Sequence, residues 1–404
     1  MNREKKVEQY DVVIIGGGAS GLTAGIYCGR ARLNTLIIEQ ALVGGLATST
    51  SEIENYPGFP EGVSGKELME FFHKQAKNFG VKFKLTDVKN VELDRDIKIV
   101  ETFRNIYEAK TVIIANGSKP RITGATNEQQ YLGRGIAFCA TCDAASNTGK
   151  VVTVIGSGDA AIEEGIFLTK FADKVIVSVI HDEGIMDCNE IAKAAALENP
   201  KMEFLWNTVV DSFEGEEQLK SVVFKNLKTK ELIKVDCATC FEFIGYLPNT
   251  DVYKDKVNMT NRGYIITNEE METNIPGVFA AGDVRDKYLR QVATCVGDAA
   301  IAGVKAEKYI AESEVFEAQI VSKDSVSYIY NAIDQNAREF LSTIEELEKE
   351  YPNYKFNKID IYKSKGIATR LGVTTSPSIV VIKDRKIVNV ISNDITKESI
   401  IKLL

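Results

Sequence analysis

The hydrophobic pattern near the start of the chain alternates between short apolar runs and an amphipathic stretch. A β-branched apolar run covers residues 11–15, a helical pattern covers 22–32, and a second apolar run covers 35–38. Runs of four or five such residues are too short for helices and are typical of buried strands. The same order recurs between residues 151 and 180. This alternation predicts an α/β protein with two βαβ units.

Further elements are predicted between and after these units. We expect a helix at 64–80, because Ser64 and Glu67 suit a capping box and Gly80 suits a helix stop. The pattern also predicts strands around 81–84, 97–103, 106–114 and 277–281 and a long helix from about 290 to 311.

The end of the chain has a pattern of its own. The pattern changes at residues 312–319, a charged and small stretch that precedes a new alternating strand. The pattern after them predicts, in order, a strand, a helix at 336–350, a strand at 355–361, a short helix, strands at 378–383 and 386–391, and a last helix. We therefore expect a small separate α/β domain at 319–404.

Composition and charge narrow the classes of function. The chain has 404 residues, of which 44% are hydrophobic and 26% charged, so two to four domains are expected. The formal net charge is -8, which does not favour a nucleic-acid partner. No apolar run approaches the roughly 18 residues of a membrane helix. The first ten residues lack the apolar core of a signal peptide, and we expect a cytoplasmic protein.

A glycine-rich turn follows the first strand of each of the two βαβ units. The first is Gly16-x-Gly18-x-x-Gly21, with Glu39 at the end of the next strand, where a carboxylate can accept from a ribose hydroxyl. The second is Gly156-x-Gly158-x-x-Ala161, with alanine as an accepted third residue. Such turns bring backbone N–H groups to a pyrophosphate. The pair predicts two nucleotide pockets, one for a flavin and one for a nicotinamide.

The seven cysteines are the main candidates for chemistry, since the chain has only two histidines, His73 and His181. The chain contains two identical four-residue motifs, Cys139-Ala-Thr-Cys142 and Cys237-Ala-Thr-Cys240. A Cys-x-x-Cys pair at a helix start suits disulfide exchange. Asp143 adjoins the first pair and is placed to move a proton.

The two cysteine motifs allow two other interpretations. The two motifs together could supply four zinc ligands. We favour buried core thiols for Cys237 and Cys240, because an apolar strand follows them at 241–244. A second redox pair is the minority interpretation, and no metal is expected.

Residues 10–312 resemble the low-molecular-weight thioredoxin reductases. The resemblance rests on the two glycine turns, on Cys139-x-x-Cys142-Asp143 and on four further motifs. These motifs are Val43-Gly-Gly45, Glu54-Asn-Tyr-Pro-Gly-Phe-Pro60, Ile244-Gly-Tyr-Leu-Pro-Asn249 and Gly282-Asp283 with Arg290-Gln291. It implies two Rossmann-like, three-layer ββα domains. The FAD-binding domain would be discontinuous, at 1–116 and 246–314, with a pyridine-nucleotide-type domain inserted at 117–245.

The resemblance also implies roles for individual residues. Cys142 would face the flavin and Cys139 would attack the disulfide of a thioredoxin-like protein, in an enzyme that is commonly a homodimer. The residues that would contact FAD are Gly16, Gly18, Gly21, Glu39, Gly44, Gly45, Leu46, Asn55, Val88, Gly117, Gly282, Asp283, Arg290, Gln291 and Val292. Two departures stand out, since Leu46 replaces a glutamine of the family and Asn116 replaces a threonine.

The electron donor is where the sequence departs furthest from the family. Reductases of this family carry His-Arg-Arg-x-x-x-Arg to bind the 2′-phosphate of NADPH, whereas this chain has His181-Asp182-Glu183 and Asp187. Carboxylates repel that phosphate, so we expect NADPH to be a poor donor. NADH could bind through the second glycine turn, with Asp182 or Glu183 accepting from the 2′-hydroxyl. Ferredoxin could instead replace the nucleotide, and both interpretations stay open.

Residues 319–404 resemble a thioredoxin fold. Ser376-Pro377-Ser378 matches the cis-proline loop, and residues 334–337 stand where that fold has its Cys-x-x-Cys. No cysteine follows Cys295, so this domain cannot exchange dithiols. It is either a docking or dimer-contact module or a remnant kept for stability. For the whole chain we predict an FAD-dependent disulfide reductase, ahead of a non-enzymatic flavin-binding redox sensor or scaffold.

Overall fold

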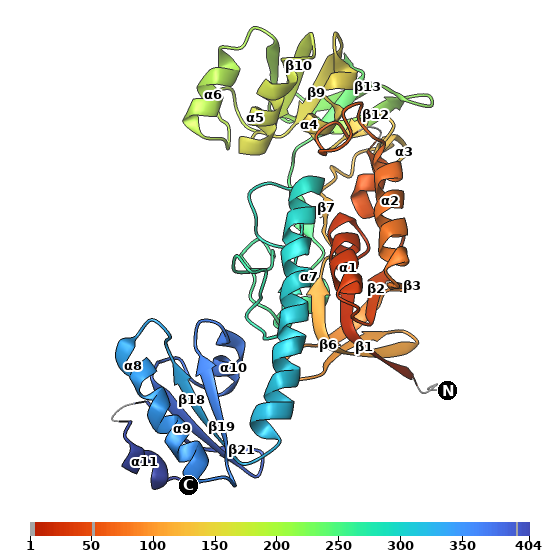
Figure 1. Cartoon of the computed structure of the whole chain (residues 1–404). Coiled ribbons are helices and arrows are strands. Elements are labelled where there is room, and N and C mark those ends of the chain that lie inside the picture. Colours follow the sequence, from red (N-terminus) through yellow and green to blue (C-terminus); the bar gives the residue numbers. More distant parts are fainter. Residues whose placement is uncertain (1–4, 51–52, 393–394) are drawn as a thin grey trace. The chain divides into compact units, whose positions relative to one another are not determined.

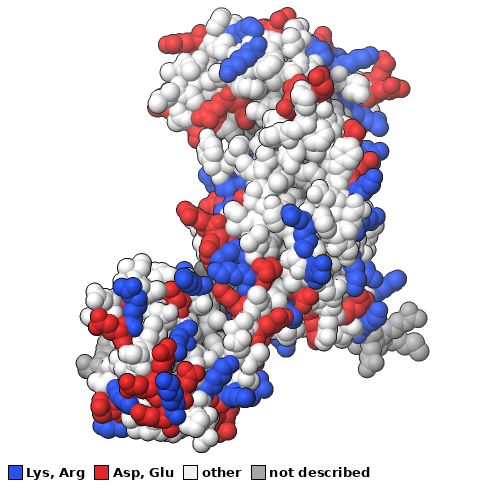
Figure 2. Space-filling model, viewed as in Figure 1, with Lys and Arg blue, Asp and Glu red and all other residues white. Residues whose placement is uncertain are grey.

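Two separately packed units make up the chain, one of residues 1–303 and one of residues 304–404. The computed structural model describes residues 5–50, 53–392 and 395–404. No helix within these ranges is both long and apolar enough to cross a membrane. On the face seen in Figure 2, acidic and basic side chains are interspersed on each unit.

A seven-stranded sheet forms the core of the first part of the larger unit. Its order is β3-β2-β1-β6-β5-β4, and β17 pairs with β6 beside β5. The strands are β1 (Lys6–Ile15), β2 (Thr35–Glu39), β3 (Lys82–Leu85), β4 (Val88–Glu92), β5 (Lys98–Thr102), β6 (Asn105–Ile114) and β17 (Val278–Ala280). The helices α1 (Ala19–Arg30) and α2 (Gly65–Asn78) pack against each other next to this sheet (Figure 1).

The predicted first strand at 11–15 is the buried half of a longer strand. Val12, Val13 and Ile14 are fully buried, as expected for a central strand covered on both faces. The strand begins at Lys6 because its more polar first half pairs in parallel with the start of β6. This extension depends on a partner about a hundred residues away, so local hydrophobicity did not predict it.

A second, five-stranded parallel sheet has the order β11-β10-β9-β15-β8, and a three-stranded antiparallel sheet has the order β12-β13-β14. Their strands are β8 (Ile136–Ala137), β9 (Val151–Ile155), β10 (Lys174–Val179), β11 (Met202–Trp206), β12 (Thr208–Gly215), β13 (Leu219–Asn226), β14 (Leu232–Asp236) and β15 (Thr239–Glu242). The helices of this region are α3 (Glu128–Tyr131), α4 (Ala140–Asp143), α5 (Asp159–Leu168) and α6 (Glu190–Leu197).

Two short strands connect the regions of these sheets. β7 (Ser118–Pro120) leads from the first region to the second, and β16 (Tyr246–Pro248) leads back, paired antiparallel to it. Next to this pair, Asn116 Nδ2 donates to the Asn249 carbonyl (2.6 Å) and Asn249 Nδ2 donates to the Asn116 carbonyl (2.8 Å). The two crossings are therefore fixed to each other.

The helix predicted to end at about residue 311 continues through the stretch 312–319, where the sequence pattern changes. Helix α7 runs over Val292–Val315, and a π-helical stretch continues it over Phe316–Val321. The stretch 312–319 contains no proline or glycine, so its charged and small residues can continue a helix. Polarity alone did not mark a helix end here.

The unit of residues 304–404 contains a four-stranded sheet of order β19-β18-β20-β21, in which β18 and β19 are parallel and the other pairs are antiparallel. Its elements are β18 (Ser325–Tyr330), α8 (Gln335–Glu339), α9 (Leu341–Glu350), β19 (Lys355–Asp360), α10 (Lys365–Arg370), β20 (Ser378–Lys383), β21 (Lys386–Ile391) and α11 (Lys397–Ile401). The predicted order is found, except that the helix expected at 336–350 is divided in two. The larger unit also contains 3₁₀ turns at Gly45–Ser49, Ala145–Asn147 and Asp251–Tyr253.

Candidate redox and nucleotide sites

Cys139 and Cys142 are joined by a disulfide at the start of α4, with their Cα atoms 5.3 Å apart. Cys139 has extended backbone and precedes the helix, which lets the chain turn back so that the two sulfurs meet. Ala140 between them is fully buried in the core of the parallel sheet, whereas Thr141 is exposed. Burial of the small alanine holds the disulfide at the surface of its domain.

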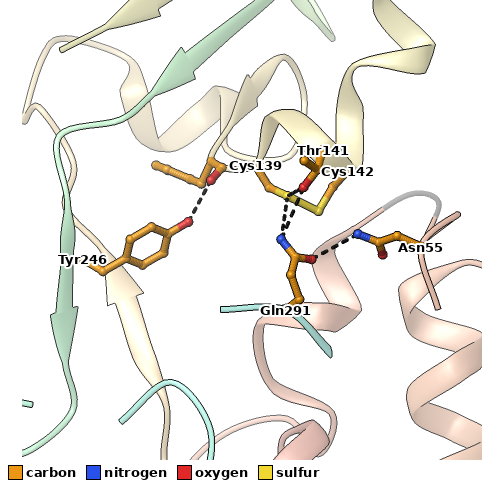
Figure 3. The surroundings of a disulfide bond; sticks show 7 residues. Asn55, Cys139, Thr141, Cys142, Tyr246 and Gln291 are labelled. Atoms are coloured by element: carbon orange, nitrogen blue, oxygen red, sulfur yellow. Dashed lines mark hydrogen bonds between the residues drawn. A yellow bond between two sulfur atoms is a disulfide. The ribbon is translucent and has the colours of Figure 1, made fainter. Parts of the chain in front are cut away.

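Gln291 connects the disulfide to the region of the seven-stranded sheet (Figure 3). Its Nε2 donates to Thr141 Oγ1 (3.3 Å) and lies 4.0 Å from Cys139 Sγ, while Asn55 Nδ2 donates to its Oε1 (3.2 Å). Tyr246 OH donates to the Phe138 carbonyl (2.8 Å) just before the pair. Two residues expected at FAD, Asn55 and Gln291, thus lie beside the redox disulfide.

Two carboxyl groups near α4 have altered acidity. Burial raises the pKa of Asp143, so this carboxyl keeps its proton to higher pH than an exposed aspartate and suits a proton carrier. Burial also raises the pKa of Glu164 on α5, although hydrogen bonds from the backbone of Ala140 and Thr141 oppose the shift. The sequence analysis did not single out Glu164, because nothing in its spacing marks it.

The first glycine turn has the shape expected for a pyrophosphate cradle. Gly16 adopts φ 107°, and a Cβ on Gly21 would lie 1.8 Å from the Gly16 carbonyl oxygen, so neither position tolerates a side chain. Gly18 precedes α1 and leaves its N-terminus open. Glu39 ends β2, and its Oε2 accepts from Gly17 N (2.7 Å). The acid therefore lies at the turn that the spacing predicted.

The other residues expected at FAD come from several segments around this turn. Gly44 N donates to the Gly17 carbonyl (2.7 Å), so the 43–45 loop packs directly on the turn. The structure places Leu46 in the 3₁₀ turn after that loop, Val88 at the start of β4, Gly117 just before β7, and Val292 at the start of α7. Gly282 and Asp283 follow β17, which ends beside β6.

The residues at this site fit a bound FAD. The Nε of Arg290 is buried and has no hydrogen-bond partner within the described residues, although the guanidinium lies over the Tyr264 ring at 4.3 Å. Among the residues that the structure describes, the donor to the Asp283 carboxyl is Cys295 Sγ (3.3 Å), a weak one, and burial raises the pKa of Asp283. A buried donor without an acceptor costs free energy unless a ligand satisfies it. A flavin ring edge and ribityl chain carry suitable polar atoms.

The carboxylate of Asp187 is hydrogen-bonded to the second glycine turn. Ser157, between Gly156 and Gly158, donates from Oγ to Asp187 Oδ2 (2.7 Å), and Asp187 N donates to the Ser157 carbonyl (3.0 Å). His181 Nε2 contacts the same Oδ2 at 2.8 Å. These bonds lower the pKa of Asp187, which stays ionised.

The two other acids of this segment differ from each other. Asp182 forms an ion pair with Lys228, which lowers the pKa of the aspartate. Glu183 is exposed, and Ala161 is buried at the third position of the turn. Glu183 is therefore the acid more available to a ribose hydroxyl.

Cys237 and Cys240 are buried thiols without a disulfide, which confirms the core interpretation. Burial raises the pKa of the Cys237 thiol to about 11. Beside them lies a buried acid pair that sequence reasoning missed. Glu128 accepts from the backbone N–H and the hydroxyl of Thr123 and from the backbone N–H of Gly124. The Glu242 carboxyl oxygens accept from no donor within the described residues, so the neighbour of this group is the Glu128 carboxyl. Burial and the neighbouring Glu128 raise the pKa of Glu242 to about 9.

Some functional contacts had no signal in the sequence. Ser157 lies inside the glycine turn at a position that the glycine pattern does not specify, and the fold brings Asp187 onto it. Glu242 is the buried last residue of β15 and stands between Phe241 and Phe243, and a charged residue within such an apolar run was a usable signal. No group of three or more His, Cys, Asp and Glu side chains in the part of the chain that the structure describes is arranged to hold a metal ion.

Comparison with known proteins identifies the family. Residues 10–299 match the family "Pyridine nucleotide-disulphide oxidoreductase". A thioredoxin reductase of Peptoclostridium acidaminophilum is 41% identical over 307 residues, covering 74% of this chain and 97% of the relative. One of Bacillus subtilis is 39% identical over 310 residues, covering 76% and 96%.

A solved structure agrees with this match. The thioredoxin reductase of Streptococcus pyogenes has a TM-score of 0.71 and 40% identity, and the match covers 75% of this chain and 98% of that one. The two Rossmann-like sheets are those of the thioredoxin-reductase fold, and the family match ends before the last quarter of the chain. The chain is an oxidoreductase that belongs to the low-molecular-weight thioredoxin reductases of the pyridine nucleotide-disulphide oxidoreductase family.

Proposed function

We propose that the enzyme transfers electrons through FAD to the Cys139–Cys142 disulfide and from there to a thioredoxin-like protein. The observation that carries this proposal is the contact of the disulfide region with Gln291, which also borders the candidate flavin site. FAD, when bound, supplies a carrier that accepts two electrons from the donor and passes them on. The proposed FAD-contacting residues are those that the resemblance implies, from the first glycine turn to Gln291 and Asn55 beside the disulfide.

The dithiol can then reduce a protein disulfide by two exchange steps. The Cys139 thiolate attacks one sulfur of the partner and forms a mixed disulfide, which releases the partner's second sulfur as a thiolate. Cys142 next attacks the Cys139 sulfur, so the Cys139–Cys142 disulfide forms again and the partner leaves as a dithiol. Asp143 is the proposed proton carrier for these steps, because burial favours its protonated form.

We propose NADH as the donor. The three acids at Asp182, Glu183 and Asp187 disfavour a 2′-phosphate and therefore NADPH. Glu183 is exposed, so its carboxylate is available to accept from a 2′-hydroxyl. Open space at Gly158 leaves room for a phosphate.

A protein donor such as ferredoxin is the second candidate, and one contact favours it. The ionised carboxylate of Asp187 is bonded to Ser157 within the glycine turn. A dinucleotide at the second turn would meet this charge together with the nearby Asp182 and Glu183, a larger negative charge than Glu39 places at the first turn. A protein that reduces the flavin directly would avoid the conflict.

Anaerobic bleaching of the flavin distinguishes the donors. NADH, NADPH and reduced ferredoxin are mixed with the enzyme in parallel, and the loss of oxidised-flavin absorbance is followed. Fast bleaching by NADH alone supports the first donor, and bleaching by ferredoxin alone supports the second. Fast bleaching by NADPH would contradict the role given to the acids. Full reduction of a protein disulfide by Cys139→Ser would rule out the assigned redox centre.

We further propose that residues 319–404 form a thioredoxin-like docking domain. The strand order β19-β18-β20-β21 and the cis peptide bond between Ser376 and Pro377 support this fold. Asp334 caps α8 where a thioredoxin has its first cysteine, accepting from Asn336 N (2.9 Å). The nearby Ile333 and the separate Tyr362 are 83% and 72% exposed, which leaves apolar surface for a partner.

The docking role predicts a split between protein and small disulfides. Ile333→Glu with Tyr362→Glu should raise the KM for thioredoxin several-fold and leave the reduction of a small aromatic disulfide unchanged. Ile387→Glu on β21 is a matched control, because Ile387 is also exposed. An unchanged KM in the double variant would contradict docking and favour a structural remnant.

We also propose a discontinuous FAD-binding domain at 1–116 and 246–314, an inserted domain at 117–245 and the C-terminal domain at 319–404. The same proposal includes a homodimer and a cytoplasmic location. The paired crossings β7 and β16 support the limits of the inserted part. Light scattering on the purified holoenzyme tests the homodimer, for which a mass near twice 44.6 kDa is expected.

A further inference from the structure

Four side chains form a continuous series of contacts that ends on a redox sulfur. Asn55 Nδ2 lies 3.2 Å from Gln291 Oε1, Gln291 Nε2 lies 3.3 Å from Thr141 Oγ1, and Thr141 Oγ1 lies 3.4 Å from Cys139 Sγ. Figure 3 shows Asn55, Gln291 and the disulfide in this order. The series crosses from the seven-stranded-sheet region to α4.

The direction of each hydrogen bond follows from the chemistry of the groups. An amide nitrogen can only donate, so the bond from Asn55 makes the oxygen of Gln291 the acceptor and turns its nitrogen toward α4. That nitrogen in turn makes the Thr141 hydroxyl an acceptor. The single proton of the hydroxyl is then left for another acceptor, and the Cys139 sulfur is the one in contact. All three bonds therefore point toward Cys139.

We propose that Thr141, oriented by Gln291 and Asn55, donates a hydrogen bond that stabilises the Cys139 thiolate. A second donor supports the assignment, because Gln291 Nε2 lies 4.0 Å from the same sulfur. Thr141 and Gln291 touch the reacting sulfur, whereas Asn55 acts through Gln291 and is a positioning residue. The inference rests on the proposed role of the Cys139–Cys142 disulfide.

The chemistry balances with one proton. Reduction of the disulfide by two electrons from the reduced flavin breaks the S–S bond and, with one proton taken up, gives one thiol and one thiolate. The negative charge stays on the sulfur with the better donors, which here is Cys139, and Cys142 holds the proton. Hydrogen bonds to the thiolate favour the charged form over the protonated form. They therefore lower the thiol pKa by about 1 unit or more.

The test measures the acidity of Cys139 alone, in the full-length holoenzyme. A Cys142→Ser background leaves one accessible thiol, because the five other cysteines are buried. The rate of alkylation by iodoacetamide is followed by intact mass between about pH 5 and 10. Thr141→Val should raise the Cys139 pKa by about 1 unit, so alkylation below that pKa slows about tenfold. Thr141→Ser, which keeps the hydroxyl, should leave the pKa unchanged.

Variants of the other two residues complete the test. Gln291→Leu should also raise the pKa, and Asn55→Ala should do so by a smaller amount, because it only frees the amide orientation. Thr141 is exposed, so its substitutions leave the fold intact. An unchanged pKa in Thr141→Val would overturn the inference while leaving the proposed function standing. Disulfide reduction by Cys139→Ser would instead overturn the proposed function.

Discussion

The two glycine turns of the larger unit share a backbone path but differ in how a carboxylate is bonded to them and in the number of acids nearby. Gly16 and Gly156 have φ 107° and 129°, and the residues before the two helices, Gly18 and Gly158, have φ -78° and -79° with extended ψ. At the first turn a carboxylate accepts from Gly17 N, whereas at the second turn Asp187 accepts from the Ser157 hydroxyl.

This difference separates what glycines specify from what side chains specify. The glycines fix the path of the backbone, and the chain repeats that path closely. The charges that surround the path decide which anion is accepted, and they come from segments that the glycine pattern does not include. A glycine motif therefore predicts a turn more securely than it predicts a ligand.

The largest effect is expected for a side chain in the first turn. Gly21→Ala would place its Cβ 1.8 Å from the Gly16 carbonyl oxygen, a clash with backbone that cannot move cheaply. We expect nearly complete loss of bound FAD, measured as the ratio of flavin to protein absorbance. Gly158→Ala meets nothing within 4 Å and should retain full FAD content. Equal FAD content in both variants would show that the turn tolerates a displaced helix.

The next effect concerns the acids of the second turn. Replacing Asp182, Glu183 and Asp187 together by arginine should speed flavin bleaching by NADPH at least about tenfold, because each charge-assisted bond to a 2′-phosphate contributes roughly 1.5–3 kcal/mol. Stopped-flow absorbance measures the rate. An unchanged rate would mean that the turn itself, and not its charge, excludes the nucleotide.

A matched control separates local charge from net charge. Glu190, Glu198 and Glu217 are exposed acids of the same region. Their joint replacement by arginine changes the net charge equally and should not accelerate bleaching by NADPH.

A moderate effect on stability is expected at the buried acid pair, which neither turn contains. The pKa of Glu242 is about 9 in the folded protein against 4.5 ordinarily, so folding retains a proton that the unfolded chain releases. The contribution of this proton to the stability of the fold is therefore fully present below about pH 4.5 and is lost progressively as the pH rises to about 9. Glu242→Gln should raise Tm by a few degrees at pH 8 and by much less at pH 5. Equal gains at both values would contradict the shifted pKa.

The smallest effect is expected for Asp187→Asn. Hydrogen bonds from Ser157 and His181 lower the pKa of Asp187, so its contribution is present at neutral pH and is lost as the pH falls through the lowered value. The side chain is exposed, and solvent weakens such contacts. Calorimetry should show a Tm change of about 1 °C or less at pH 7. A large loss would indicate that the carboxylate holds the turn together.

The sequence predicted most of the elements because their signals are local. The apolar runs at β1, β9 and β10 and the cap of α2 by Ser64, which accepts from Glu67 N (3.1 Å), are visible in a few residues. The first half of β1 was missed because pairing with β6 creates it. The helix over 312–319 was missed because nothing in its polarity distinguishes a connection from an exposed helix.

The candidate site divides in the same way. Cys139, Cys142 and the glycines are adjacent in sequence or follow fixed spacings, so they were found. The contact of Gln291 with Thr141 joins residues 150 positions apart, and that of Ser157 with Asp187 joins residues 30 apart. Such contacts depend on how sheets and helices pack, which one sequence does not record.

The paired crossings at β7 and β16 have a consequence for protein engineering. Because the two strands are hydrogen-bonded neighbours, the ends of the segment between them lie about one strand spacing apart, roughly 5 Å. A segment whose ends meet can be removed from its host and the gap closed with a short turn. The chain thus enters and leaves residues 121–245 at neighbouring points, and we expect that a short turn can join Pro120 to Tyr246 when that segment is removed.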